Sequence, residues 1–107
     1  MRLVIAALCL VLIAGCAAIP RATHQLESAR AAYRAAAASP EVQARAPVEL
    51  QIAERALGDA ERFQQADADP VMVAHFAYLA ERRSRIAVKT AELRTAEAVL
   101  ATSRAQR

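Results

Sequence analysis

Cys16 is the residue of this sequence whose type and position most directly indicate chemistry. The segment before it has the order of a secretory signal peptide: a basic start at Met1-Arg2, an apolar run over 3–13 and small residues up to Gly15. The sequence therefore predicts export, with a cleavage site among the small residues that lead to Cys16. Because Cys9 leaves with the signal peptide, Cys16 becomes the only cysteine of the exported chain, and we expect no disulfide.

With a cysteine in the first position after the cut, Ile13-Ala14-Gly15-Cys16 resembles the lipobox of bacterial lipoproteins. The resemblance implies that the Cys16 thiol carries diacylglycerol and that the acylated cysteine becomes the N-terminus. It divides the chain into a signal peptide (1–15), an acylated tether (16–20) and an Ala-rich helical domain (21–105). Three alternatives remain: an ordinary signal peptide cut a few residues later, an uncleaved membrane anchor over 3–19, and a buried core helix.

The other chemically reactive side chains give no sign of catalysis or metal binding. His24 and His75 have no His or Cys at the i+3 or i+4 spacing that metal ligands on one helical face need. The serines have no adjacent Gly-rich turn, and no phosphate-binding glycine loop occurs. We therefore expect no enzymatic activity, metal, cofactor or small-molecule substrate. The carboxylates of Glu27, Glu41, Glu49 and Glu81 are expected to pair, at i,i+3 or i,i+4 spacing, with Arg30, Arg45 and Arg85.

One basic strip is a candidate partner-facing surface. Arg82, Arg85 and Lys89 are three and four residues apart, so they share one face of a helix. Such a strip can meet an acidic protein surface, anionic lipid head groups or a lipopolysaccharide phosphate. The alternative is a solvated face, because nearby glutamates supply partial counter-charge. Although the net charge of +3 would allow nucleic acid as a partner, both signs are mixed along the chain and export argues against it.

The elements that position these residues are expected to be helices. β-branched residues are scattered after residue 20, and no alternation typical of strands runs far. Ser39-Pro40 and Asp69-Pro70 each offer a capping side chain followed by proline, which marks a helix start. We predict an all-α fold, a small antiparallel bundle with helices at about 21–38, 47–67 and 71–104. The last two form an αα-hairpin, and 40–46 is either a short helical turn or a loop.

Apolar residues at heptad spacing predict the packed faces of these helices. The last helix is the longest, and its turns beyond about residue 95 are expected to project or fray. Gly58 lies within a strong helix and either permits close helix contact or has no such role. The predicted face of the first helix is Ala22, Leu26, Ala29, Tyr33 and Ala36. That of the second is Leu50, Ala53, Leu57 and Ala60, widened by Ile52, Ala56 and Phe63. That of the last is Met72, Phe76, Leu79, Ile86, Leu93 and Leu100, with small packing positions beside it at Val73, Ala77, Ala80, Ala87, Ala91 and Ala98.

The alanine spacing of the hairpin carries a family resemblance. Ala46-Pro47-Val48-Glu49-Leu50 opens a helix with alanines up to Ala60, and an Ala-rich helix follows from Ala74. After a lipobox, this pattern resembles domain-of-unknown-function family 4398 of proteobacterial envelope proteins, over about 22–100. The resemblance implies a small helical envelope lipoprotein with no established activity. Longer members continue into an OmpA-like peptidoglycan-binding domain, but this sequence ends at Arg107, so we do not expect direct peptidoglycan binding.

Together these features predict a non-enzymatic lipoprotein of the outer membrane whose periplasmic domain is a protein-interaction module of the envelope. Bacterial sorting rules favour the outer membrane when the residue after the cysteine is not aspartate, and here it is Ala17. The expected partner is an envelope protein, OmpA-like or cell-wall associated, or a second copy of the chain. The alternatives are a purely structural spacer of the envelope and a periplasmic ligand- or metal-binding module.

Overall fold

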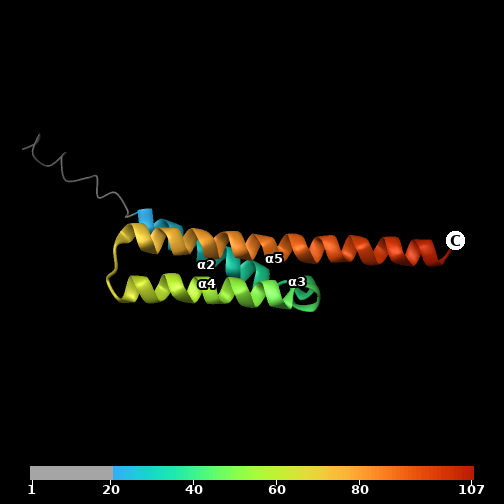
Figure 1. Cartoon of the computed structure of the whole chain (residues 1–107), viewed down its shortest axis with the longest axis horizontal. Coiled ribbons are helices and arrows are strands. Elements are labelled where there is room, and N and C mark those ends of the chain that lie inside the picture. The colour runs from blue at the N-terminus through green and yellow to red at the C-terminus, as the bar shows by residue number, and fades with distance from the viewer. Residues whose placement is uncertain (1–20) are drawn as a thin grey trace, which may run out of the picture.

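The computed structural model describes residues 21–107, and this part of the chain is all-α, as predicted. It contains four helices within those residues: α2 (Arg21–Ala37), α3 (Pro40–Arg45), α4 (Pro47–Gln65) and α5 (Pro70–Ala105). α4 runs antiparallel to α5, whereas α2 runs in the same direction as α5 (Figure 1). The three predicted helices are confirmed to within two residues at each end. For 40–46, the helical alternative is the correct one.

The prolines mark the helix starts, as predicted. The Ser39 hydroxyl accepts a hydrogen bond from the Val42 amide at 3.3 Å, and Pro40 is the first residue of α3. The Asp69 carboxylate accepts one from the Val71 amide at 2.8 Å, ahead of α5. These side chains satisfy amides that the first turn of a helix leaves without a partner. α4 has no side-chain cap and instead follows α3 directly through the buried Ala46.

The turn between α4 and α5 closes with a left-handed residue. Asp67 has φ of 53°, the Ala68 amide donates to the Phe63 carbonyl at 3.0 Å, and the Asp67 amide donates to the Gln64 carbonyl at 3.1 Å. This pair of bonds is the Schellman arrangement that ends many helices, although glycine is its usual left-handed residue. The turn reverses the chain tightly, so the αα-hairpin predicted for α4 and α5 is confirmed.

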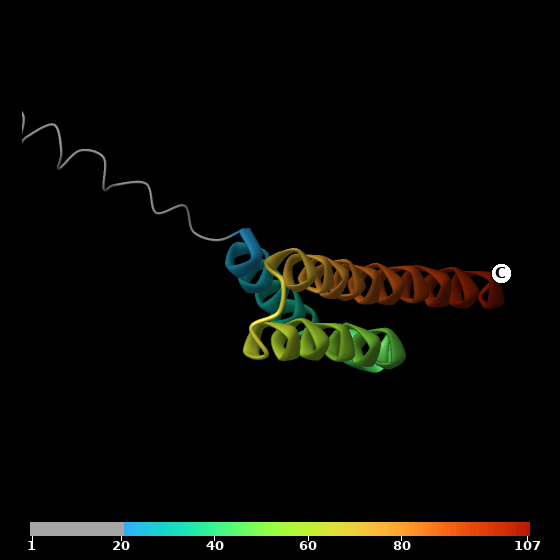
Figure 2. The same ribbon diagram turned by 60° about the vertical axis from the view of Figure 1, so that its left-hand side comes forward.

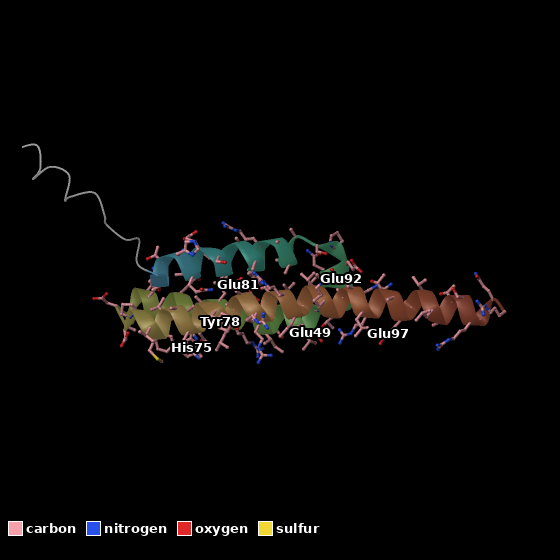
Figure 3. All side chains as sticks on the ribbon, turned by 90° about the horizontal axis from the view of Figure 1, so that it is seen from above. Glu49, His75, Tyr78, Glu81, Glu92 and Glu97 are labelled. Atoms are coloured by element: carbon pink, nitrogen blue, oxygen red, sulfur yellow. The ribbon has the colours of Figure 1, made fainter. Side chains whose placement is uncertain are left out.

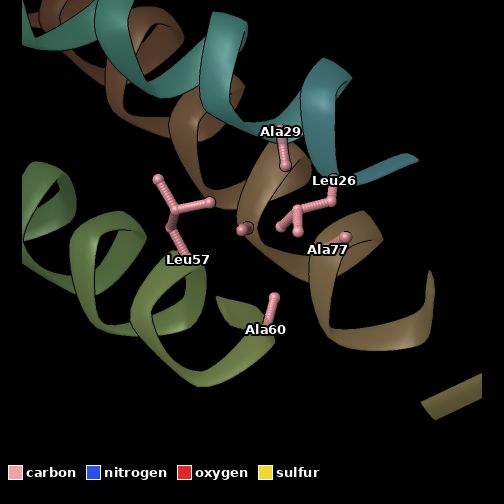
Figure 4. Close-up of a cluster of buried hydrophobic side chains, with 6 residues drawn as sticks. Leu26, Ala29, Leu57, Ala60 and Ala77 are labelled. Atoms are coloured by element: carbon pink, nitrogen blue, oxygen red, sulfur yellow. The ribbon is translucent and has the colours of Figure 1, made fainter. Parts of the chain in front are cut away.

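The core is built largely from small side chains. In the turned view of Figure 2, α2 lies against both α4 and α5, and these three helices surround the main cluster of buried residues. Because alanines stand where the helices face one another, the backbones approach closely and little space is left for larger groups. The main cluster, shown in Figure 4, consists of Leu26 and Ala29 from α2, Leu57 and Ala60 from α4, and Ala77 and Ala80 from α5.

The face of α5 that packs in the core differs from the prediction. Its buried residues follow a regular 4-3-4-3-4 spacing: Val73, Ala77, Ala80, Ser84, Ala87 and Ala91. Of the predicted large residues, Phe76 and Leu79 are only half-buried, and the others are exposed. The predicted core role of Met72, Ile86, Leu93 and Leu100 is therefore wrong. The small residues expected beside them form the core, with the exception of the half-buried Ala98.

Two further expectations about packing are decided by the structure. Ile52 does not widen the packed face of α4, because its side chain is 40% exposed. Gly58 does not permit a close helix contact, since a Cβ placed there would meet no atom within 4 Å. The predicted faces of α2 and α4 are otherwise confirmed by the burial of Leu26, Ala53 and Leu57.

The last turns of α5 project beyond the rest of the bundle (Figure 1). The helix has 36 residues and remains helical to Ala105, whereas α4 has 19. At about 1.5 Å per residue, α5 is roughly 25 Å longer than α4. The projection predicted beyond residue 95 is confirmed, and the alternative of fraying is not seen.

Candidate functional site

Two of the predicted site residues, Gly15 and Cys16, lie outside the described residues, as do the signal peptide (1–15) and the tether (16–20). Cleavage and lipidation therefore stay predictions. Within residues 21–107, no helix combines the length and the apolar character that a membrane span requires.

The predicted basic strip, Arg82, Arg85 and Lys89, lies on the face of α5 that points away from the core. All three side chains are exposed. The Lys89 ammonium is 2.8 Å from a carboxylate oxygen of Glu92, and Arg85 pairs with Glu81. Among the described residues, Arg82 pairs with no carboxylate. Its guanidinium instead stands 6.0 Å from the centre of the Tyr78 ring, in cation–π geometry.

Beside the basic strip runs a line of large apolar side chains, which we name the apolar seam: Met72, Leu79, Ile86, Leu93 and Leu100. Its members are seven residues apart. Met72, Ile86, Leu93 and Leu100 are between 42% and 59% exposed, and Leu79 is half-buried. Single exposed apolar residues are common on the surface of a soluble protein, whereas a regularly repeated row of large ones favours an interface.

The basic strip and the apolar seam meet in a shallow groove along α5. The groove has a volume of about 430 Å³ and is lined by Arg82, Arg85, Ile86, Lys89, Thr90 and Leu93. Residue spacing predicts its cations, whereas the apolar pattern of α5 wrongly predicts Ile86 and Leu93 in the core. The polar residues Arg83, Thr90 and Glu97, which lie at intermediate positions of the seam, were the signal that this face meets water.

A second groove of about 440 Å³ lies between α2 and α5, on the other side of the cations. Ser28 and Ala32 of α2 and Val88 of α5 are among its lining residues. Arg85 and Lys89 line both grooves, so they form the ridge that separates them.

Glu81 anchors this ridge to α2. One carboxylate oxygen accepts hydrogen bonds from the Gln25 amide at 2.8 Å and the Ser28 hydroxyl at 3.1 Å, and the other pairs with Arg85. The side chain of Glu81 is only 12% exposed. Figure 3 shows Glu81 between α2 and α5. The predicted Glu81–Arg85 pair is confirmed, whereas the contacts of Glu81 with α2 were not predicted.

Of the other three predicted carboxylate pairs, one is confirmed and two are wrong. Glu27 pairs with Arg30 at 2.6 Å, as expected. Glu41 and Glu49 were predicted to pair within 40–50 and instead contact α5: Glu41 accepts a hydrogen bond from Thr95, and Glu49 pairs with Arg94 at 2.9 Å. α5 runs so close to α3 and α4 that its side chains compete with local partners.

Within residues 21–107, three groups have pKa values displaced by their surroundings. Hydrogen bonds to Glu61 and then to Glu27 raise the pKa of the Arg30 guanidinium. Burial raises the pKa of the Tyr33 hydroxyl. A hydrogen bond from its own backbone amide, followed by that from Arg94, lowers the pKa of the Glu49 carboxyl. These shifts arise from contacts that hold the helices together, and none of the three lines the groove of the basic strip.

His75 and Ser84 make local contacts within α5. The His75 ring packs edge-on against Phe76 with centroids 5.6 Å apart, and His24 is exposed on α2. The Ser84 hydroxyl is buried and donates to the Ala80 carbonyl at 2.9 Å, within its own helix. Over residues 21–107, no group of three or more His, Cys, Asp and Glu side chains is arranged to hold a metal ion.

Comparison with known proteins places the chain in a family. The model of the family described as "Domain of unknown function (DUF4398)" matches residues 24–103, about three quarters of the chain. Neither the curated proteins nor the solved structures give a match. The chain therefore belongs to the DUF4398 family.

Proposed function

We propose that this DUF4398 protein is a non-enzymatic lipoprotein of the outer membrane, and that its helical domain is a protein-interaction module facing the periplasm. Acyl chains on Cys16 hold it at the membrane, and the outward face of α5 contacts the partner. Family membership supports a helical domain without an assigned activity, and the order of residues 1–16 supports export and lipidation.

The observation that carries the interaction function is the pairing of the apolar seam with the basic strip. Ile86 and Leu93 are 45% and 59% exposed, directly beside Arg82, Arg85 and Lys89. Leaving large side chains in water forfeits about 25 cal/mol per Å² of apolar area that an interface would recover. An interface also combines apolar contact with charges that orient the partner.

The membrane anchor is tested at Cys16. The unsubstituted chain is expected to fractionate with membranes and to incorporate a palmitate analogue, and Cys16→Ser should lose both properties. Stable anchoring needs more than one acyl chain, because each buried CH₂ contributes only about 0.8 kcal/mol. Recovery of the unsubstituted chain in periplasmic extract, without label, would contradict the anchor.

The interaction function is tested by chemical crosslinking of intact cells, followed by purification of the full chain. Adducts with another envelope protein are expected, and Cys16→Ser should reduce them if the anchor places the domain beside that protein. Recovery of the chain alone, or crosslinked only to itself, would contradict a module that binds other proteins.

A structural spacer is the second candidate, favoured by the projecting end of α5. A continuous helix of 36 residues is a rigid rod, and a rod sets a distance irrespective of its surface. Under this candidate, ending the chain after Thr95 changes envelope integrity, whereas reversing the charges of the basic strip does not. If the domain is an interaction module, reversing the charges of the basic strip should change envelope integrity more than ending the chain after Thr95 does.

A further inference from the structure

We propose that the partner seated on α5 is an acidic amphipathic helix of another envelope protein, which lies along the apolar seam with its carboxylates against Arg82, Arg85 and Lys89. This inference rests on the proposed interaction function and deepens it by stating the chemistry of the partner. Three features of α5 carry it: the period of the seam, the sign of the flanking charge and the way that charge is held.

The period of the apolar seam indicates a helical partner. Met72, Ile86 and Leu100 are separated by multiples of seven residues. In a straight α-helix such a row drifts by about 20° per heptad, and it stays against a partner only when both helices wind around each other with a left-handed twist. The row then supplies one residue per heptad to knobs-into-holes packing, which an extended strand or a loop does not match.

The flanking charges disfavour a second copy of this chain on the same surface in two simple arrangements. In a parallel pair of α5 helices, Arg82 and Lys89 would each lie level with their own copies. In an antiparallel pair centred on Ile86, the level of Lys89 coincides with that of Arg83. Both arrangements bring cations together as water is excluded, and like charges across an interface disfavour association. A partner with carboxylates at those levels turns the same charges into attraction.

The cations are available to such a partner because they are exposed and because the Glu81 carboxylate has other hydrogen-bond donors. The side chains of Arg85 and Lys89 are 64% and 78% exposed, so their present ion pairs are screened by water and weak. When Arg85 turns toward a partner, the Glu81 carboxylate keeps its hydrogen bonds from Gln25 and Ser28. Arg82, which stacks near Tyr78, offers a third cation at the same edge of the groove.

The test uses the full chain in its own cells, with a photoreactive benzophenone amino acid placed at Ile86 or Leu93. The same amino acid at Gln51 or Arg55, on the exposed side of α4, gives the comparison. We expect adducts at Ile86 and Leu93 in which the captured peptide comes from another protein, has an apolar heptad pattern and carries Asp or Glu beside it. Mass spectrometry of the adduct reads that sequence directly.

Two triple charge-reversal variants distinguish a specific effect of the basic strip from an effect of the net charge. The triple variant Arg82→Glu, Arg85→Glu and Lys89→Glu should lower the adduct yield at Leu93 at least about tenfold, the factor that corresponds to ~1.4 kcal/mol. The control triple, Arg34→Glu, Arg55→Glu and Arg104→Glu, changes the net charge equally at three exposed sites away from the groove and should leave the yield within about twofold.

Each other outcome overturns the inference in a distinguishable way. Adducts at Ile86 with this chain, with lipid or with a basic or non-helical peptide would exclude the acidic helix. An equal loss of adduct yield in both triple variants would exclude it as well. Protein adducts at Gln51 or Arg55 alone would leave the proposed interaction function standing and move its surface to α4. The absence of protein adducts at all four positions would remove the proposed function as well.

Discussion

Glu49 in the first turn of α4 and Arg94 in α5 form an ion pair, with Arg94 Nη2 2.9 Å from Glu49 Oε1, across 45 residues of sequence. Arg94 also donates to the Arg45 carbonyl at the end of α3. One guanidinium therefore ties the junction of α3 and α4 to the long helix. This contact lies where the hairpin ends and α5 begins to project, so we expect it to limit opening of the bundle at that end.

The lowered pKa of Glu49 predicts how the stability of the domain depends on pH. A group whose pKa is lower in the folded chain stabilises the fold above its ordinary pKa of about 4.5, and this contribution is lost as the pH falls through the folded pKa. A soluble fragment of residues 21–107 should therefore lose more of its melting temperature between pH 6 and pH 3 than Glu49→Gln does. Thermal melts followed by circular dichroism measure the difference, and parallel pH curves would contradict it.

The small-residue core predicts that a larger side chain is harmful even when it is apolar. Ala80 is fully buried where α5 faces the other helices, so Ala80→Leu should lower the free energy of unfolding by about 1–3 kcal/mol. Ala96→Leu adds the same atoms to the same helix at an exposed position and should be close to neutral. Urea titration measures both. If Ala80→Leu were stabilising, the close approach of α5 to its neighbours would be wrong.

How much of this fold follows from the sequence is visible in α5. Its start comes from Asp69-Pro70, and its length follows from an uninterrupted run of helix-forming residues. The choice of buried face does not follow, because the helix carries two heptad rows. Side-chain size predicts that the row with Leu79 and Ile86 is the core, since large apolar groups usually contribute most to burial. The distance between the helices decides which row is buried. The small side chains of Ala77 and Ala80 let the helices approach so closely that the row of large side chains does not fit between them.

The candidate site was predictable in part for the same reason. The cations of the basic strip follow from spacing alone, because residues three and four apart share a face of any helix. The contacts of Glu41 and Glu49 with α5 do not, since they join residues about 50 positions apart and depend on how the hairpin is aligned. Local spacing offers Arg45 to both carboxylates. Tertiary packing supplies Thr95 and Arg94 instead.

The left-handed turn residue predicts a contrast between two substitutions. With φ of 53°, Asp67 occupies a region that glycine enters freely and that a β-branched residue avoids. Asp67→Gly should maintain or raise the melting temperature, whereas Asp67→Val should lower stability by about 1–2 kcal/mol. Both variants keep the backbone bonds of the Schellman turn available. Equal stability of the two would show that the turn adjusts its backbone.

Gly58 offers a stabilising substitution. It lies inside α4, and a Cβ there would meet no atom within 4 Å, so alanine adds no clash. Because glycine has greater backbone freedom in the unfolded chain, Gly58→Ala should stabilise the domain by about 0.5–1 kcal/mol. Chemical denaturation should show a higher midpoint with an unchanged slope. A lower midpoint would mean that α4 needs this glycine for a contact outside the domain.

Aspartate substitutions at two leucines distinguish the core from the partner surface. Leu57 is 8% exposed within the main cluster, so Leu57→Asp buries an unpaired charge and should lower the free energy of unfolding by about 3 kcal/mol or more. Leu93 is 59% exposed, and Leu93→Asp should change that free energy by no more than about 0.5 kcal/mol. In cells, however, Leu93→Asp should weaken crosslinking from Ile86, because it interrupts the apolar seam. A Leu93→Asp chain that folds normally and retains every adduct would show that the seam contacts only water at this position.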